Sequence, residues 1–451
     1  MEDNAAEALA SLLRKLADET TQRVGAYRDA GELVLRPVAY QKWRVTDLSY
    51  NESGLGYTLG AVEVSVDEWD LSNRFDFIDK QVRTIPEYPQ CAAVVSAKRS
   101  VGVDEAEKWL LQFVHTVLDQ AAGVRQEPPR DAISAFVADV CEMQIEWNAE
   151  VWVEGIWLED QRYEVEQGFT LRRPTLSDLE VQRPHELFLV EEMAGQHRVT
   201  QAVIELRYRG TDRELSGEIE FVIDVLRLFR LGSVYIARVD AAPLSIIRRG
   251  FWSRSPEASS AKLKYRFTAA DVPLLSRLME QLRRVARAKR ASLASDLESL
   301  EIARHRFADA LAEAGVIDSI TGAVMGLEAI YSKGGERTDI SRRLGQRVSA
   351  LLRLVGFSPL EVADAVRRAY HVRSTFLHGS REKGDEDVLR QLSRTSLEFL
   401  RVSLLVFSQL IPPHGKDDVL TLLDNSLLEA RSARSVAKMV APTTVTGVYP
   451  R

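Results

Sequence analysis

The run IEWNAEVWVEGIWL at residues 145–158 decides the fold class, because here strand-like composition replaces the helical spacing of apolar residues. Its β-branched and aromatic residues alternate in part with polar ones, which is typical of strands in a half-buried sheet. Similar runs follow at residues 163–171, 187–190, 201–208, 233–238 and 263–267. With one helix expected at about 217–230, the sequence predicts a β-rich middle region.

Beyond Asp271 the strand signals stop, and apolar residues recur at helical spacing. Glycines such as Gly315, Gly356 and Gly379 end these segments, and Ser358-Pro359 is a typical helix start. The expected helices span about 271–290, 294–313, 316–332, 338–355, 358–378, 385–411 and, more weakly, 416–432. Strands followed by helices, without alternation, predict an α+β protein with separate domains.

The N-terminal part mixes the two patterns. Helices are expected at residues 1–28 and 103–121, and strand-like runs occur at 33–37, 57–66 and 92–96. Two prolines in QEPPR, residues 126–130, indicate a boundary. We therefore divide the chain into four parts: a mixed α/β region of unknown role (1–128), a β-rich domain (129–290), a helical bundle (291–435) and a flexible tail (436–451).

The composition is that of an ordinary globular protein. The 451 residues are 45% hydrophobic and 28% charged, with a formal net charge of -7, which excludes wholesale disorder and a generic nucleic-acid coat. Cys91 and Cys141 show no metal-binding spacing, so we expect no disulfide framework, no metal site and no cofactor. No apolar run approaches the roughly 20 residues of a membrane span, and signal-peptide features are missing. We expect a cytoplasmic protein with no membrane partner.

The segment AYHVRSTFLHGS, residues 369–380, is the most informative for chemistry. It places Arg373 and His378 near the end of an expected helix, with four residues between them. An Arg and a His at this spacing are weak evidence alone. The context strengthens the signal, since the polar Ser374 follows the arginine and Gly379 follows the histidine.

With this segment, residues 294–432 resemble a HEPN domain, a helical family named for higher eukaryotes and prokaryotes nucleotide-binding. The closest similarity is to the ApeA-like branch of bacterial anti-phage proteins. Residues 157–179, which include the run LRRPTLSDL, also resemble the β-rich region that precedes such domains. The segments that carry the main resemblance are IDSITGAVMGLEAIY (317–331), RLGQRVSALL (343–352) and YHVRSTFLHG (370–379).

The resemblance implies a metal-independent endoribonuclease, often a toxin or defence effector, that is completed by homodimerisation. Carried over, Arg373 would bind and polarise the scissile phosphate, Ser374 is the polar position, and His378 would be the acid and base. The partner would be RNA, and the regions before the bundle would sense an unknown trigger or regulate the bundle. Two other interpretations stay open: a non-catalytic adaptor whose bundle only mediates assembly, and a nucleic-acid binder that senses without cutting.

Helical geometry adds an independent prediction. Arg373 shares one apolar stripe with Val366 and Ala369, and Glu328 shares another with Val324. A lone buried charge is costly, so the two opposite charges should pair, with Glu328 orienting Arg373. Five residues correspond to about 140° around a helix, so Arg373 and His378 diverge within one chain. They can serve one phosphate only if the helix end distorts or two chains contribute the groups.

Two further features concern partners. The helix expected at 385–411 carries two apolar lines, and the simplest neighbour for the second line is another copy of the chain. We therefore expect a homodimer through the C-terminal bundle. A basic run on the preceding helix, including Arg283, Arg287 and Arg290, could follow an RNA backbone, although a solvated helix face is the commoner explanation.

Overall fold

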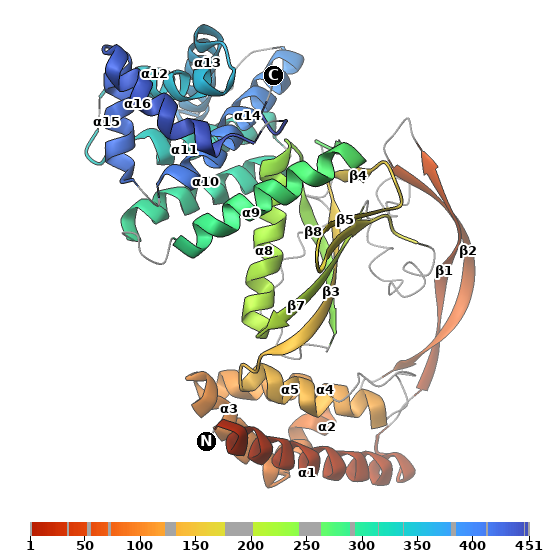
Figure 1. Ribbon diagram of the computed structural model, residues 1–451. Coiled ribbons are helices and arrows are strands. Elements are labelled where there is room, and N and C mark those ends of the chain that lie inside the picture. The colour runs from red at the N-terminus through yellow and green to blue at the C-terminus, as the bar shows by residue number, and fades with distance from the viewer. Residues whose placement is uncertain are drawn as a thin grey trace.

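In the computed structural model, N-terminal helices lie at one end, an antiparallel sheet lies in the middle, and a helical bundle lies at the other end (Figure 1). The structure describes residues 2–33, 36–51, 56–70, 74–121, 132–175, 202–242, 263–288, 294–313, 315–336, 338–379, 385–411, 414–445 and 447–449. The expected strand at 187–190 and the boundary at 126–130 lie outside these ranges.

The N-terminal helices share a hydrophobic core of their own. The helix α4 buries Leu110, Phe113 and Val114, which recur at helical spacing. The expected strand at 92–96 is wrong, because these residues belong to α3, where Cys91, Ala92 and Val95 form one buried helical face. The elements of this region are α1 (Glu2–Asp29), α2 (Arg74–Lys80), η1 (Val82–Thr84), α3 (Glu87–Arg99), α4 (Val103–Ala121) and α5 (Ala132–Val140).

The position of α5 differs from the division expected from the sequence. Phe136 of α5 packs against Phe113 of α4, with ring centroids 5.4 Å apart, and lies in the N-terminal core. This helix therefore packs with the N-terminal region and not with the sheet that follows it. Between α1 and α2 the chain forms a long antiparallel hairpin of β1 (Arg36–Asn51) and β2 (Gly56–Asp70), which Figure 1 shows extending from the N-terminal helices towards the sheet.

The middle region is a five-stranded antiparallel sheet in the order β5-β6-β7-β3-β8. The sequence run that decided the fold class forms the interior strand β3, between β7 and β8, and then β4, which pairs in parallel with β9. The helix α8 packs beside the sheet and begins with a capping box of Thr211 and Glu214. The elements are β3 (Ile145–Glu154), β4 (Ile156–Leu158), β5 (Arg162–Glu166), β6 (Phe169–Arg172), β7 (Ala202–Gly210), α8 (Asp212–Phe229), β8 (Tyr235–Ala242) and β9 (Tyr265–Phe267).

After the sheet the described chain is helical, as the sequence predicted. The expected weak helix at 416–432 is replaced by two helices, α15 and the start of α16. The elements are η3 (Ala269–Asp271), α9 (Val272–Ala288), α10 (Ala294–Ala312), α11 (Val316–Tyr331), α12 (Ile340–Leu352), η5 (Arg353–Val355), α13 (Pro359–Leu377), α14 (Glu386–Leu410), α15 (Lys416–Ser426), α16 (Ala430–Val440) and η6 (Ala441–Thr443).

The long helix α14 is buried on both sides by its own chain. Leu400 and Leu404 of one apolar line and Val406 of the other are fully buried. The helices α10, α11 and α13 contact α14, and so do α8, α9 and α16. The inference that its second face needs a partner chain is therefore wrong, because the helices next to the sheet cover that face.

Arg401 of α14 joins the bundle to the middle region. Its guanidinium is almost completely buried, pairs with Glu398, and donates to the carbonyl oxygen of Phe229 at 3.1 Å. Carbonyl groups at a helix C-terminus lack partners within the helix and carry partial negative charge, so this cation satisfies the end of α8. The sheet, α8 and the bundle share one continuous hydrophobic core, which runs across the expected boundary at residue 290.

Where the structure describes residues 436–451, which were expected to form a flexible tail, they pack against the rest of the chain. The first of these residues complete α16, and Val445 and Val448 are buried in the shared core. Arg401 donates to the carbonyl oxygen of Val448 at 3.1 Å. Strands in the middle followed by a helical C-terminal part agree with the predicted α+β class. Within the described ranges, no helix combines the length and apolarity that crossing a membrane requires.

Candidate functional site

The candidate site begins with an ion pair between two neighbouring helices. Arg373 of α13 and Glu328 of α11 face each other, with Nη2 and Oε2 3.0 Å apart. Their side chains are 18% and 20% exposed, so each is largely withdrawn from water. The pairing expected from the two helical stripes is thus confirmed, because both charges lie on the sides of α11 and α13 that turn towards the bundle.

The electrostatics of this pair are unfavourable for Glu328. Burial raises the pKa of its carboxyl above the ordinary value, and the nearby Arg373 offsets only part of that shift. The guanidinium of Arg373 also lies over the ring of Tyr370, with its carbon 5.5 Å from the ring centroid. The Nε atom of Arg373 is buried without a hydrogen-bond partner among the described residues. The pair therefore holds an incompletely satisfied arginine beside a carboxylate that would be more stable in water.

His378 lies at the end of the same helix in a different environment. It is the C-cap residue of α13 and is exposed, and its backbone amide donates to the carbonyl oxygen of Ser374 at 3.2 Å. Gly379 then turns the chain with φ +76°, which only glycine adopts easily. Among the described residues, Arg373 and His378 make no polar contact with each other. One chain thus presents a half-buried arginine and an exposed histidine.

Exposed apolar side chains occur in the two helix ends that flank His378 in the sequence. Phe376 and Leu377 in the last turn of α13 are 37% and 58% exposed, and Val388 in the first turn of α14 is 53% exposed. Contiguous exposed apolar side chains are typical of a contact surface, and these three lie within 13 residues of one another in the sequence. We call Phe376, Leu377 and Val388 the apolar rim.

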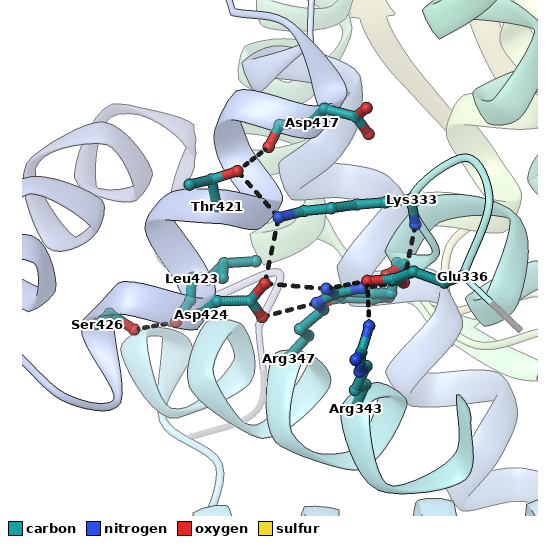
Figure 2. A network of polar contacts seen from close by, with 10 residues as sticks. Lys333, Glu336, Arg343, Arg347, Asp417, Thr421, Leu423, Asp424 and Ser426 are labelled. Carbon is teal, nitrogen blue, oxygen red and sulfur yellow. Dashed lines mark hydrogen bonds and ion pairs between the residues drawn. The ribbon is translucent and has the colours of Figure 1, made fainter. Parts of the chain in front are cut away.

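A second polar cluster, which the sequence did not indicate, links α12 to α15 (Figure 2). Arg347 is nearly fully buried and lies between Glu336 and Asp424, donating to Glu336 Oε1 at 2.7 Å and to Asp424 Oδ1 at 2.8 Å. The hydrogen bonds from Arg347 lower the pKa of Glu336 to about 2. Arg343 and Lys333 complete the network. Because each carboxylate of this cluster is paired with cations from other parts of the bundle, the cluster is suited to holding helices together.

Of the basic run on α9 that the sequence suggested for RNA binding, the structure describes the side chain of Arg283, which is engaged within the chain. Arg283 makes ion pairs with Glu166 of the sheet and Glu218 of α8, and its guanidinium lies over the ring of Phe221. Two carboxylates of its own chain therefore already engage Arg283, and its assignment to RNA binding stays a prediction. The side chain of Arg287 and the whole of Arg290 lie outside what the structure describes.

Comparisons with protein-family models, curated proteins and solved structures find no match to this chain.

Proposed function

We propose that the C-terminal bundle, residues 291–435, is a HEPN-like, metal-independent endoribonuclease. The observation that supports it best is the Glu328–Arg373 pair, with an exposed histidine five residues further along the same helix. Burial of Glu328 costs more than the attraction of Arg373 returns. Side chains kept in place against such a cost are typical of functional sites.

The proposed active site takes groups from two copies of the chain. Arg373 is largely buried and His378 is exposed, in keeping with the angle of about 140° that separates the two positions around an ideal helix. Two chains that meet at the apolar rim would bring two copies of His378 to one cleft, with Arg373 on either side. The apolar rim therefore replaces the second face of α14 as the surface through which the homodimer would form.

The chemistry follows from what these groups can do. One His378 accepts the proton of the ribose 2′-hydroxyl, and the 2′-oxygen attacks the adjacent phosphorus. The bond from phosphorus to the 5′-oxygen breaks, and the protonated His378 of the second chain gives that oxygen its proton. Arg373 donates to the non-bridging oxygens as negative charge increases there. The products are a 2′,3′-cyclic phosphate and a 5′-hydroxyl.

The decisive experiment is cleavage of a defined RNA by the purified protein in EDTA. We expect cleavage by the wild type, loss of cleavage in His378→Ala, and retention in His371→Ala, which removes another exposed histidine of the same helix. Replacing the ribose at the cut site by deoxyribose should stop the reaction. A 5′-phosphate product, or dependence on a metal, would contradict the proposed roles.

The adaptor interpretation has one observation in its favour: Glu328 already occupies the charge of Arg373, as in a purely structural pair. It predicts that His378→Ala changes neither RNA integrity nor assembly, whereas changes in the apolar rim abolish assembly.

A further inference from the structure

A second candidate site lies at the C-terminal end of α14, where α9, α14 and α16 meet. His378, at the end of α13, precedes the other end of α14 in the sequence. An open cavity of about 510 Å³ is lined there by residues of α9, the C-terminal end of α14, α16 and η6. A smaller cavity of about 300 Å³ adjoins it and shares Gln281 and Arg284. Small-molecule sites usually have volumes of this order, between about 300 and 1,000 Å³.

The rim of this cavity is cationic. Arg284 of α9, Lys438 of α16 and His414 after α14 all line it, and Arg277 lines the adjoining cavity. Within the described part of the chain, the side chains of Lys438 and His414 have no polar partner. Arg284 pairs with Glu280 at 2.9 Å, but both side chains are 67% exposed, and such pairs contribute little. An anion could therefore compete for Arg284 at little cost.

The inner wall has a different character. Leu410 of α14 and Met439 of α16 supply apolar surface. Gln281 also lines the cavity, and its Oε1 atom is buried without a hydrogen-bond partner among the described residues. A buried acceptor without a donor is costly, so this atom requires an N–H or O–H group.

The walls are held in place by contacts that do not involve a ligand. Gln409 at the end of α14 donates to the carbonyl oxygen of Thr443 at 3.1 Å, and the hydroxyl of Tyr449 donates to the same oxygen at 3.0 Å. Gln281 itself donates from Nε2 to the carbonyl oxygen of Pro442 at 3.4 Å. These contacts fix η6 against α9 and α14, so the cavity is formed before anything binds.

We propose that this cavity binds a small organic phosphate whose apolar, ring-like end carries an N–H donor. The phosphate would be held by Arg284 and Lys438, with His414 beside them. The ring would lie against Leu410 and Met439, and its N–H would donate to Gln281 Oε1. The site is separate from Arg373 and His378, and it does not depend on the proposed ribonuclease. It connects α9, which contacts the sheet, to α14, which runs towards the motif, and so it is a position from which a ligand could act on both.

Isothermal titration calorimetry on the full chain tests the proposal, with AMP as the probe. AMP has the phosphate, the ring and an amino group, whereas adenosine lacks the phosphate, ribose 5-phosphate lacks the ring, and inorganic phosphate lacks both. We expect AMP to bind at least tenfold more tightly than each of the three. Arg284→Ala and Lys438→Ala should each weaken AMP about tenfold, and Gln281→Leu should weaken AMP while leaving ribose 5-phosphate unchanged.

Lys108→Ala is the matched control, because it removes an exposed lysine from α4 in the N-terminal region. It should bind AMP like the wild type. Equal melting temperatures for wild type, Arg284→Ala and Lys438→Ala would confirm that the variants are folded. Failure of AMP to bind at millimolar concentration would overturn the proposal. So would AMP binding that survives both charge removals, or inorganic phosphate that binds as tightly as AMP.

Discussion

Glu328 lies 3.0 Å from Arg373, yet burial keeps the pKa of its carboxyl above the ordinary value. The attraction between the two charges therefore does not compensate for removing the carboxylate from water. Pairs of this kind are poor stabilisers as a unit, although each partner depends on the other. The pair is therefore costly to bury as a unit, although the loss of either partner alone would be more costly still.

The first prediction concerns that pair. Arg373→Met leaves Glu328 buried without its partner, and Glu328→Leu does the same to Arg373, so each change should destabilise the fold by about 1–3 kcal/mol. The double variant removes both charges and should recover most of the loss, because an apolar pair replaces a desolvated ionic one. Urea denaturation of all four proteins measures this cycle. Additive losses in the double variant would mean that the two side chains are energetically independent.

The second prediction concerns pH and Glu336. Its pKa is about 2 in the folded protein, against an ordinary value of 4.5. Between these values the unfolded chain binds a proton that the folded chain does not, so stability from this group is present above pH 4.5 and is lost as pH falls towards 2. The slope from one such group approaches about 1.4 kcal/mol per pH unit. Glu336→Gln should flatten the acid limb of a stability curve measured by urea unfolding.

Glu328→Gln is the control for that measurement, since the pKa of Glu328 is shifted in the opposite direction. In the folded state Glu328 binds its proton more readily than in the unfolded chain, so it favours folding at low pH and this contribution is lost as pH rises. Its removal should steepen the acid loss. A flattening by Glu328→Gln would show that its environment is not dominated by burial.

The third prediction concerns the junction between sheet and bundle. Arg401→Ala would leave the carbonyl oxygens of Phe229 and Val448 without their donor and Glu398 without its partner. We expect a loss of about 3–5 kcal/mol, the range for breaking a buried charge pair. Arg401→Lys keeps the charge but not the planar guanidinium with its several donors. Its stability should therefore lie between those of the wild type and Arg401→Ala. Thermal unfolding measures the effect, and Arg390→Ala, which removes an exposed arginine of the same helix, should be nearly neutral.

The fourth prediction concerns assembly through the apolar rim. Leu377→Asp places a charge among exposed apolar side chains, so it should abolish a dimer formed there without lowering the melting temperature. RNA cleavage should be lost together with the dimer if two chains share the site. Leu428→Asp is the control, because Leu428 is 88% exposed between α15 and α16, away from the rim. Light scattering that shows a monomer with full cleavage activity would exclude the shared site.

Local patterns in the sequence predicted most of the helices and strands. The run at 145–158 predicted strands, and the helical spacing after Asp271 predicted helices, because the alternation of apolar and polar residues directly reports the period of each element. The same arithmetic predicted that Arg373 faces Glu328, since both lie on stripes that must turn towards a core. It failed at residues 92–96, where a run too short to distinguish the two periods belongs to a helix.

What the sequence determined alone was therefore which segments are helix or strand and which face of each is buried, because these properties depend on residues only a few positions apart. Only the tertiary structure decided what covers each buried face. The second face of α14 is covered by the chain itself, Arg283 is neutralised by the sheet and α8, and the C-terminal residues enter the core. Such contacts join segments far apart in the sequence, as Arg401 and Phe229 are, and no local period encodes them.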